Sequence, residues 1–212
     1  MTSSAISAQG SVLSIGTGSG SAKPITAIQL GNPTIITAAA HGFNNGDVVS
    51  VAGLTGADAA LLNGLNLSVR NVTTNTFAFN VDTTGKTIVA AGAATPVTFT
   101  AISNIKDFSG FDGAASEIDV TNLDSTAKEY RLGLADSGQF TFNIDYDSTS
   151  AGHIALQAKK VSGVLSNFKL VLPSSQVITF TGFVKKFSLA GGVDAVAKTA
   201  VDIRISGAVS GL

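Results

Sequence analysis

The stretch FTFNIDYD, residues 140–147, alternates large apolar side chains with polar ones along its whole length. Successive side chains of a strand point to opposite faces, so this pattern predicts an antiparallel strand with one packed face and one solvated face. TFAFNVD (76–82) and VDIRISG (201–207) show the same period. Turn sequences such as LGNP (30–33) and NNGD (44–47) separate these runs. The sequence therefore predicts a mainly β protein.

One helical pattern interrupts the strands, roughly over residues 150–162. Its apolar and small residues recur at helical spacing, at Ala151, Ile154, Ala155, Ala158 and Val161. Ser148 or Ser150 can cap its N-terminus and Gly163 can end it. We expect one short helix lying across a sheet, with His153 on the outer face of the helix.

The composition limits the classes of function. Hydrophobic residues make up 44% of the 212 residues and charged residues only 13%, against roughly 25% in an average globular protein. Little exposed charge suits a β subunit whose surface is partly covered by neighbours, and equally a Gly-rich monomeric sandwich. The net charge of −1 offers no basic footprint for tight nucleic-acid binding.

Cysteine is absent, so disulfides and thiolate metal sites are excluded. The start, MTSSAISAQG, lacks the basic and apolar regions of a signal peptide. No apolar run approaches the ~18 residues of a membrane span. We expect a soluble protein made in the cytoplasm.

Residues 25–85 form a pattern of their own, with about five short strands between Gly or Asn turns. Only six charged side chains lie in residues 1–105, and most lie beyond, which also indicates two differently built segments. If residues 25–85 are removed, the flanks at 10–20 and 92–105 can join as one hairpin. An insertion at a hairpin tip costs little loop-closure entropy. We predict an inserted β-module over 25–85 and a discontinuous domain over 1–24 and 86–212; one continuous sandwich is the alternative.

The chemistry of an enzyme is not evident. His41 lies in a turn context, AAAHGFNNGD, without a second metal ligand nearby, and His153 stands alone on the helix. The Gly-rich stretch GTGSGSAK (16–23) lacks the spacing and context of a phosphate loop. Carboxylate pairs such as Asp145 with Asp147 lie on a polar strand face, where no apolar pocket raises a pKa. We expect no enzyme activity, cofactor or metal.

A long connection lies within residues 103–147. About 26 residues in its middle show no clean period, which compact domains rarely tolerate without a function. The connection mixes apolar anchors with charged residues, as protein–protein interfaces do; a self-packed loop is the alternative. The candidate contact residues are Phe108, Phe111, Glu117, Asp119, Asp124, Lys128, Glu129, Tyr130 and Arg131.

Four elements resemble the major tail tube proteins of long-tailed, siphovirus-type bacteriophages, in order and spacing. They are EIDVTNLDS (117–125), GLADSGQF (133–140), FTGFVKKFS (180–188) and IRISG (203–207). The likeness covers about 10–20 and 92–212. Residues 25–85 are similar to a small β-module found appended to phage and surface proteins.

The resemblance implies a tail-tube-type β-sandwich or barrel with one flanking helix, assembled as stacked hexameric rings. It implies an arm that grips the adjacent ring and a lumen through which DNA passes without specific binding. Asp145, Asp147 and Asp202 are candidates for a mildly acidic lumen wall, balanced by Lys169 and Lys185 if these share the face. Implied partners are further copies of the chain and the tape measure, tail terminator and distal tail proteins. Assembly would take place in the host cytoplasm, with the product in the virion tail and the inserted module on its outer surface.

Two other functions remain open. The same fold could form the inner tube of a contractile tail or injection system, although an external module would interfere with a sheath. A carbohydrate-binding or adhesin β-protein belongs to a different class, and the missing signal peptide argues against it.

Overall fold

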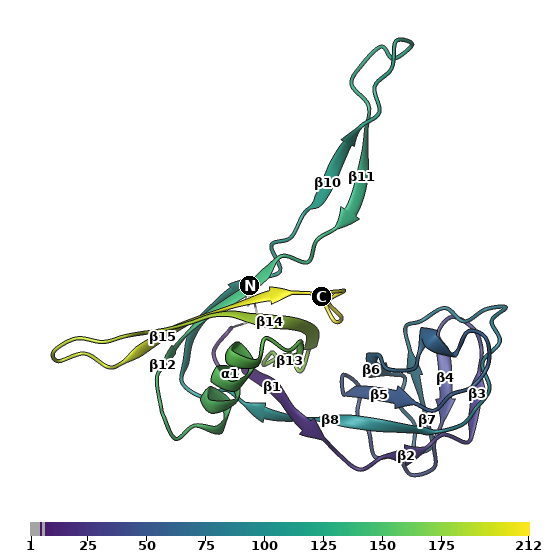
Figure 1. Ribbon diagram of the computed structural model, residues 1–212, viewed down its shortest axis with the longest axis horizontal. Coiled ribbons are helices and arrows are strands. Elements are labelled where there is room, and N and C mark those ends of the chain that lie inside the picture. The colour runs from purple at the N-terminus through teal and green to yellow at the C-terminus, as the bar shows by residue number, and fades with distance from the viewer. Residues whose placement is uncertain (1–4, 6) are drawn as a thin grey trace. The chain divides into compact units, whose positions relative to one another are not determined.

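The computed structural model describes Ala5 and Ser7–Leu212 and is mainly β with one α-helix, which confirms the predicted fold class (Figure 1). The described residues divide into two compact units. Unit 1 holds the residues up to Thr100, with Lys169–Thr179 and Ser210–Leu212; unit 2 holds Ala101–Phe168 and Phe180–Val209. None of the helices in the described part of the chain has the length and apolar character needed to cross a bilayer.

Unit 1 contains a sheet whose strands follow the order β3-β4-β7-β6-β5-β8-β1. Its strands are β1 (Val12–Ser19), β2 (Lys23–Pro24), β3 (Ala27–Gln29), β4 (Thr34–Thr37), β5 (Val48–Ala52), β6 (Asn66–Arg70), β7 (Thr76–Phe79) and β8 (Ala93–Ala101), with a 3₁₀ turn at Ala59–Leu61. Pairing from β3 through β8 is antiparallel. β2 also pairs with β8.

The core of unit 1 is built mostly from the segment predicted as a module. Its buried cluster runs in sequence from Ile25 to Ala94 and centres on Phe77 and Phe79 of β7. His41 directly follows the turn at residues 39–40, in the predicted turn context, but its side chain is buried against this core. The imidazole packs against the rings of Phe43 and Phe77, and its Nδ1 accepts a hydrogen bond of 3.0 Å from the backbone N–H of Phe43. Its Nε2 lies 3.3 Å from the carbonyl of Thr76, so both nitrogens of the buried ring have polar partners.

The strands that flank this segment lie next to each other. β1 and β8 are neighbours in the sheet, and the hydroxyls of Thr17 and Thr100 lie 2.9 Å apart. The Gly20 amide donates to the carbonyl of Pro96. β1 and β8 therefore pair directly, and the insertion of residues 25–85 between them stays a prediction.

Unit 2 contains an antiparallel sheet in the order β14-β15-β12-β9. Its elements are β9 (Ile105–Gly110), β10 (Ala115–Asp119), β11 (Tyr130–Ala135), β12 (Gln139–Asp145), α1 (Ala151–Ser162) and β15 (Lys198–Ile205). The residues of β13 (Ser166–Val171) and β14 (Val177–Ala190) are divided between the two units.

The alternating pattern within residues 140–147 forms a strand with one buried face, as predicted. Phe140, Phe142 and Ile144 of β12 are buried and pair with Ile203, Val201 and Thr199 of β15. Phe180 connects this layer to Phe168, with ring centroids 5.3 Å apart. One face of the sheet is therefore core, and the other is polar.

α1 comprises nearly the residues predicted to be helical, but the face that it buries is opposite to the predicted one. Gly152, His153 and Leu156 are buried, whereas Ile154 and Val161 are exposed. His153 was expected on the outer face, and that prediction was wrong: its Nε2 lies 2.9 Å from the carbonyl of Ser103 and its Nδ1 accepts the backbone N–H of Asp147 at 3.1 Å. The helix turns this way because Gly152 lets its backbone approach Ala101 more closely than a Cβ would permit.

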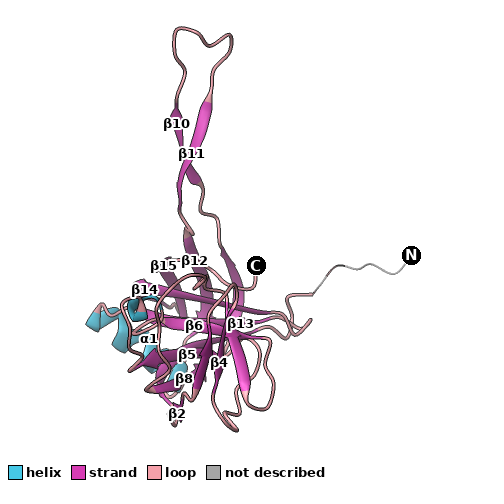
Figure 2. Cartoon of the chain, turned by 90° about the vertical axis from the view of Figure 1, so that its right-hand side faces the viewer, coloured by secondary structure: helices cyan, strands magenta, loops and turns pink. Residues whose placement is uncertain are grey.

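The long connection is not irregular, as the absence of a period had suggested. Residues 115–135, here called the arm hairpin, form a two-stranded antiparallel sheet of β10 and β11. Figure 2 shows this ribbon extending beyond β12, which follows it in unit 2. The alternation is short and restricted to β11, and the facing residues of β10 are mostly polar, because neither strand packs on the core of the subunit.

Candidate assembly surfaces

The base of the arm hairpin is fixed by two aspartates. Asp112 accepts a hydrogen bond of 3.1 Å from the Gln139 amide, and Asp136 accepts one of 2.9 Å from Gly138. Asp136 also forms an ion pair with Arg204 of β15. These bonds to Gly138 and Arg204 hold the pKa of Asp136 below its usual range. Both ends of the hairpin are thus tied to the sheet of unit 2.

The tip of the arm hairpin is ordered by its own short polar side chains. Asp119 accepts the Thr121 amide at 2.9 Å, and the Thr121 hydroxyl accepts the Glu129 amide at 3.0 Å. Hydrogen bonds from the hydroxyl and amide of Thr121 lower the pKa of Asp119. Asp119 therefore keeps its negative charge and shapes the turn.

One face of the arm hairpin carries an apolar row. Tyr130, Leu132 and Leu134 alternate along β11, with exposed fractions of 52%, 76% and 92%. Side chains opposite each other in an antiparallel pair share a face, and the partners of Leu132 and Tyr130 are Glu117 and Asp119. An isolated two-stranded hairpin is marginally stable in water, and exposed apolar rows with a polar rim mark interaction sites.

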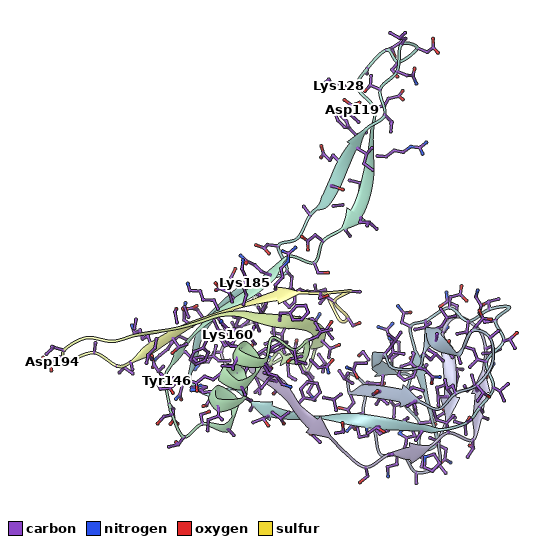
Figure 3. The ribbon with its side chains drawn as sticks, viewed as in Figure 1. Asp119, Lys128, Tyr146, Lys160, Lys185 and Asp194 are labelled. Atoms are coloured by element: carbon purple, nitrogen blue, oxygen red, sulfur yellow. The ribbon has the colours of Figure 1, made fainter. Side chains whose placement is uncertain are left out.

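The nine candidate contact residues do not all lie on the arm hairpin. Phe108 stacks on Phe140, and Phe111 packs against Phe140 and Phe180. These two phenylalanines are half-buried and pack against the core of unit 2. The structure brings Glu117, Asp119, Tyr130 and Arg131 together on the paired strands, and places Asp124, Lys128 and Glu129 in the loop between them; Figure 3 labels Asp119 and Lys128 there. The nine candidates omit Leu132 and Leu134, although both alternate with Tyr130 along β11 in the sequence.

The polar face of the unit 2 sheet is the second candidate surface. Asp145 of β12 is paired across the sheet with Lys198, and its carboxylate lies 2.7 Å from the ammonium of Lys106. Asp202 of β15 lies opposite Thr141 and 4.0 Å from Lys186. Both carboxylates thus have lysine neighbours, so this face has balanced charge.

The three lumen candidates are not brought together. Asp147 follows the end of β12 and accepts hydrogen bonds of 2.7 and 2.8 Å from the hydroxyl and amide of Thr149. These bonds lower the pKa of Asp147, which serves the turn before α1. Of the two lysines, Lys185 is exposed at a bulge of β14 (Figure 3), whereas Lys169 pairs with Asp47 in unit 1.

The sheet also has open edges. β9 is the last strand of its sheet, next to β12. β13 has 6 residues and joins the 14-residue β14 through a tight turn, so it covers at most the first half of β14. Exposed strand edges are templates for pairing with another chain.

Comparison with known proteins identifies one matching family and a relative from a phage. A family described as phage tail tube, TTP, lambda-like, matches residues 79–176. "Structural protein 3" of Pseudomonas phage PAJU2 is 29% identical over 125 residues, which cover 49% of this chain and 76% of that protein. The family match includes the arm hairpin, β12 and α1.

Two solved structures show a partial likeness. A chain from the virion of a native gene transfer agent particle has a TM-score of 0.46 and 16% identity, over 53% of this chain and 87% of that chain. A chain from the tail of an empty gene transfer agent particle with C6 symmetry has a TM-score of 0.46 and 17% identity, over 54% and 86%.

Proposed function

We propose that the chain is a major tail tube protein of the phage type. In this proposal it assembles into stacked hexameric rings whose joined sheets enclose the channel for DNA ejection. The matched family is structural rather than enzymatic. The arm hairpin carries the proposal, because its exposed apolar row needs a covering surface. The number of six subunits follows from the tail tube resemblance.

Ring closure would use the open edges of unit 2. We infer that β9 of one subunit pairs with the outer half of β14 of the next. These two edges are different surfaces, so the contact is head-to-tail and closes into a ring when the rotation allows it. Each subunit then extends the sheet of its neighbour around the axis.

The polar face of the joined sheet would line the lumen. Lys106 and Lys186 neutralise Asp145 and Asp202 there, so this wall is paired rather than mildly acidic. A strongly cationic wall would bind phosphate through counterion release and slow DNA. Balanced charge keeps the wall wet without that attraction. Asp147 lies beyond the end of β12 and is not part of the proposed wall.

The arm hairpin would join one ring to the next. Its contact residues in this proposal are Tyr130, Leu132 and Leu134, with Glu117 and Asp119 as the polar rim. Residues 25–85 would remain outside the tube as a module, since nearly all members of their buried cluster lie within that segment. The tape measure, terminator and distal tail proteins would meet the tube at its lumen and ends.

A charge placed in the apolar row tests this function. Leu132→Asp with Leu134→Asp should abolish tubes while leaving a folded subunit, because both side chains are exposed in the single chain. The matched control is Leu65→Asp, an exposed leucine of the module. Negative-stain microscopy and sedimentation would score the tubes, and circular dichroism would score folding. Tubes of normal length from the double variant would refute the inter-ring role of the arm.

A further inference from the structure

The outer face of α1 is an apolar stripe without a cover in the described chain. Ala151, Ile154, Ala158 and Val161 are all exposed, and they repeat at the i, i+3 and i+4 spacing of one helix face. Ile154 is 52% and Val161 is 88% exposed. Val164 and Leu165, which follow Gly163 just beyond the helix, are also exposed. We call these six residues the α1 stripe.

The stripe has the amphipathic pattern of a packing face. A surface helix normally turns such a stripe toward the core, yet Gly152, His153 and Leu156 hold the opposite face inward. Contiguous exposed apolar patches mark interaction sites. The local sequence thus encodes two contact faces on one helix, and only one of them is used within the chain.

A second copy of this chain offers a surface of matching length. The row from Tyr130 to Leu134 spans four strand steps, about 13 Å at ~3.3 Å per residue. Ile154 to Val161 spans seven helix steps, about 10 Å at ~1.5 Å per residue. An apolar strand row can therefore lie along the stripe. In Figures 1 and 2 the subunit's own arm hairpin extends away from α1, so the row and the stripe meet only between copies.

The charges of the two surfaces are complementary. The last turn of α1 carries Lys159 and Lys160, and residues 148–168 contain no acidic side chain. The arm face with the apolar row carries Glu117 and Asp119. Opposite charges at the rim of a contact favour correct orientation and encounter. Figure 3 shows Lys160 on the helix and Asp119 on the arm hairpin.

We propose that the apolar row of the arm hairpin docks on the α1 stripe of a subunit in the adjacent ring. This inference rests on the proposed tube assembly and names its acceptor surface. Tyr130, Leu132 and Leu134 cover Ile154, Val161 and Leu165, and Glu117 and Asp119 face Lys159 and Lys160. Each subunit gives one arm and receives one.

Cross-linking tests the contact directly, because the chain has no cysteine. Leu132→Cys with Val161→Cys in one polypeptide, treated with a short bismaleimide after assembly, should give a ladder of covalent oligomers on denaturing gels. Leu132→Cys alone gives no ladder beyond a dimer. Leu132→Cys with Val193→Cys is the matched control, because Val193 is an equally exposed valine on the β14–β15 hairpin. A ladder from the Val193 pair and none from the Val161 pair would overturn the proposal.

A second variant separates this inference from the proposed function. Val161→Asp, at an exposed site, should raise the critical concentration for tubes about tenfold, since a charge would be buried in the contact. Val193→Asp should leave it unchanged. If Val161→Asp forms tubes normally while Leu132→Asp with Leu134→Asp does not, the acceptor site is wrong and the arm function stands. If both variants form tubes normally, both proposals fail.

Discussion

The ammonium of Lys106 lies 2.7 Å from the carboxylate of Asp145 across neighbouring strands of unit 2. The bulge between β9 and β12 makes this approach possible, because it inserts Lys106 between residues that pair with Asn143 and Ile144. The other carboxylate oxygen of Asp145 is buried without a partner among the described residues. Asp145 therefore depends on Lys106 more than an ordinary surface carboxylate depends on its neighbours.

Removal of this cation should destabilise the subunit. Lys106→Met is expected to lower the free energy of unfolding by about 1 kcal/mol, because it leaves a partly buried carboxylate without its partner. Lys186→Met is the matched control: its ammonium lies 4.0 Å from Asp202 and should contribute less than about 0.5 kcal/mol. Urea denaturation of unassembled protein measures both. Equal effects of the two changes would contradict a special role for Lys106.

Reversal of charge at the same position tests the lumen wall. Asp145→Lys should leave tubes intact but slow DNA exit, because it adds a cation beside Lys106 on the proposed channel face. Particles carrying the variant would be compared in an ejection assay at low and high salt, with Asp82→Lys in the module as the control. Ejection at the normal rate at both salt concentrations would place the channel elsewhere.

Substitutions at two adjacent residues of α1 test which face of the helix is buried. His153→Ala is expected to cost about 2–4 kcal/mol, because it opens a cavity and leaves the Ser103 carbonyl and the Asp147 amide without their partner. Ile154→Ala, on the exposed face, should change stability by less than about 0.5 kcal/mol. Thermal or urea unfolding distinguishes them. A larger cost at Ile154 would mean that the helix is rotated.

Close packing at Gly152 should outweigh helix propensity. Alanine favours a helix over glycine by about 1 kcal/mol, but a Cβ at Gly152 would clash with the Ala101 carbonyl. Gly152→Ala is therefore expected to destabilise unit 2 by about 1–3 kcal/mol. Gly191→Ala, where a Cβ meets open space, is the control. Stabilisation by Gly152→Ala would show that α1 does not approach the backbone of Ala101 so closely.

The arm tip should weaken in acid. The pKa of Asp119 is lowered by its bonds to the Thr121 hydroxyl and amide, so ionised Asp119 stabilises the tip above its unfolded pKa of about 3.9. That contribution is lost as the pH falls through the lowered folded pKa. Carboxyl NMR titration of unassembled protein should show the lowered pKa, and Thr121→Val should raise it. An unchanged pKa in Thr121→Val would contradict the turn geometry.

The module can be deleted where the two chain segments that lead into and out of it pair with each other. Lys23 and Pro24 pair with Ala94 and Ala93, and the Ile25 amide donates to the Gly92 carbonyl. Replacing residues 25–92 by a short Gly linker should preserve tubes, because the ends already lie side by side. A deletion of 25–85 alone leaves the buried Ile88 without its cluster and is the less stable comparison. A folded deletion variant that cannot polymerise would show that the module takes part in the ring.

The sequence predicted those elements whose periodicity matches their burial. Alternation over 140–147 and 201–205 identified β12 and β15 because each packs one face on a core. The same reasoning failed for the arm hairpin, since the alternation of Tyr130, Leu132 and Leu134 is confined to β11 and packs on no core of the subunit. It failed for α1 because the apolar stripe from Ile154 to Val161 is directed outward, while a glycine and a histidine with both nitrogens bonded form the inner face.

The candidate assembly surfaces could be predicted from the sequence only in part. The mixture of apolar and charged residues singled out the segment that forms the arm hairpin, and Tyr130 and Glu117 lie together on one exposed face of it. Long-range pairing could not be read from the chain: Phe108 and Phe111 join the core through Phe140, and Lys106 reaches Asp145 through a bulge. These relations depend on strand register, which sequence spacing alone does not determine.

A helical reconstruction of assembled tubes by electron cryo-microscopy tests the central claim most directly. The account predicts that residues 115–135 cross from one ring to the next, with Leu132 buried against the neighbouring subunit. An arm hairpin that stays within its own ring, or that remains solvent-exposed in the finished tube, would contradict it.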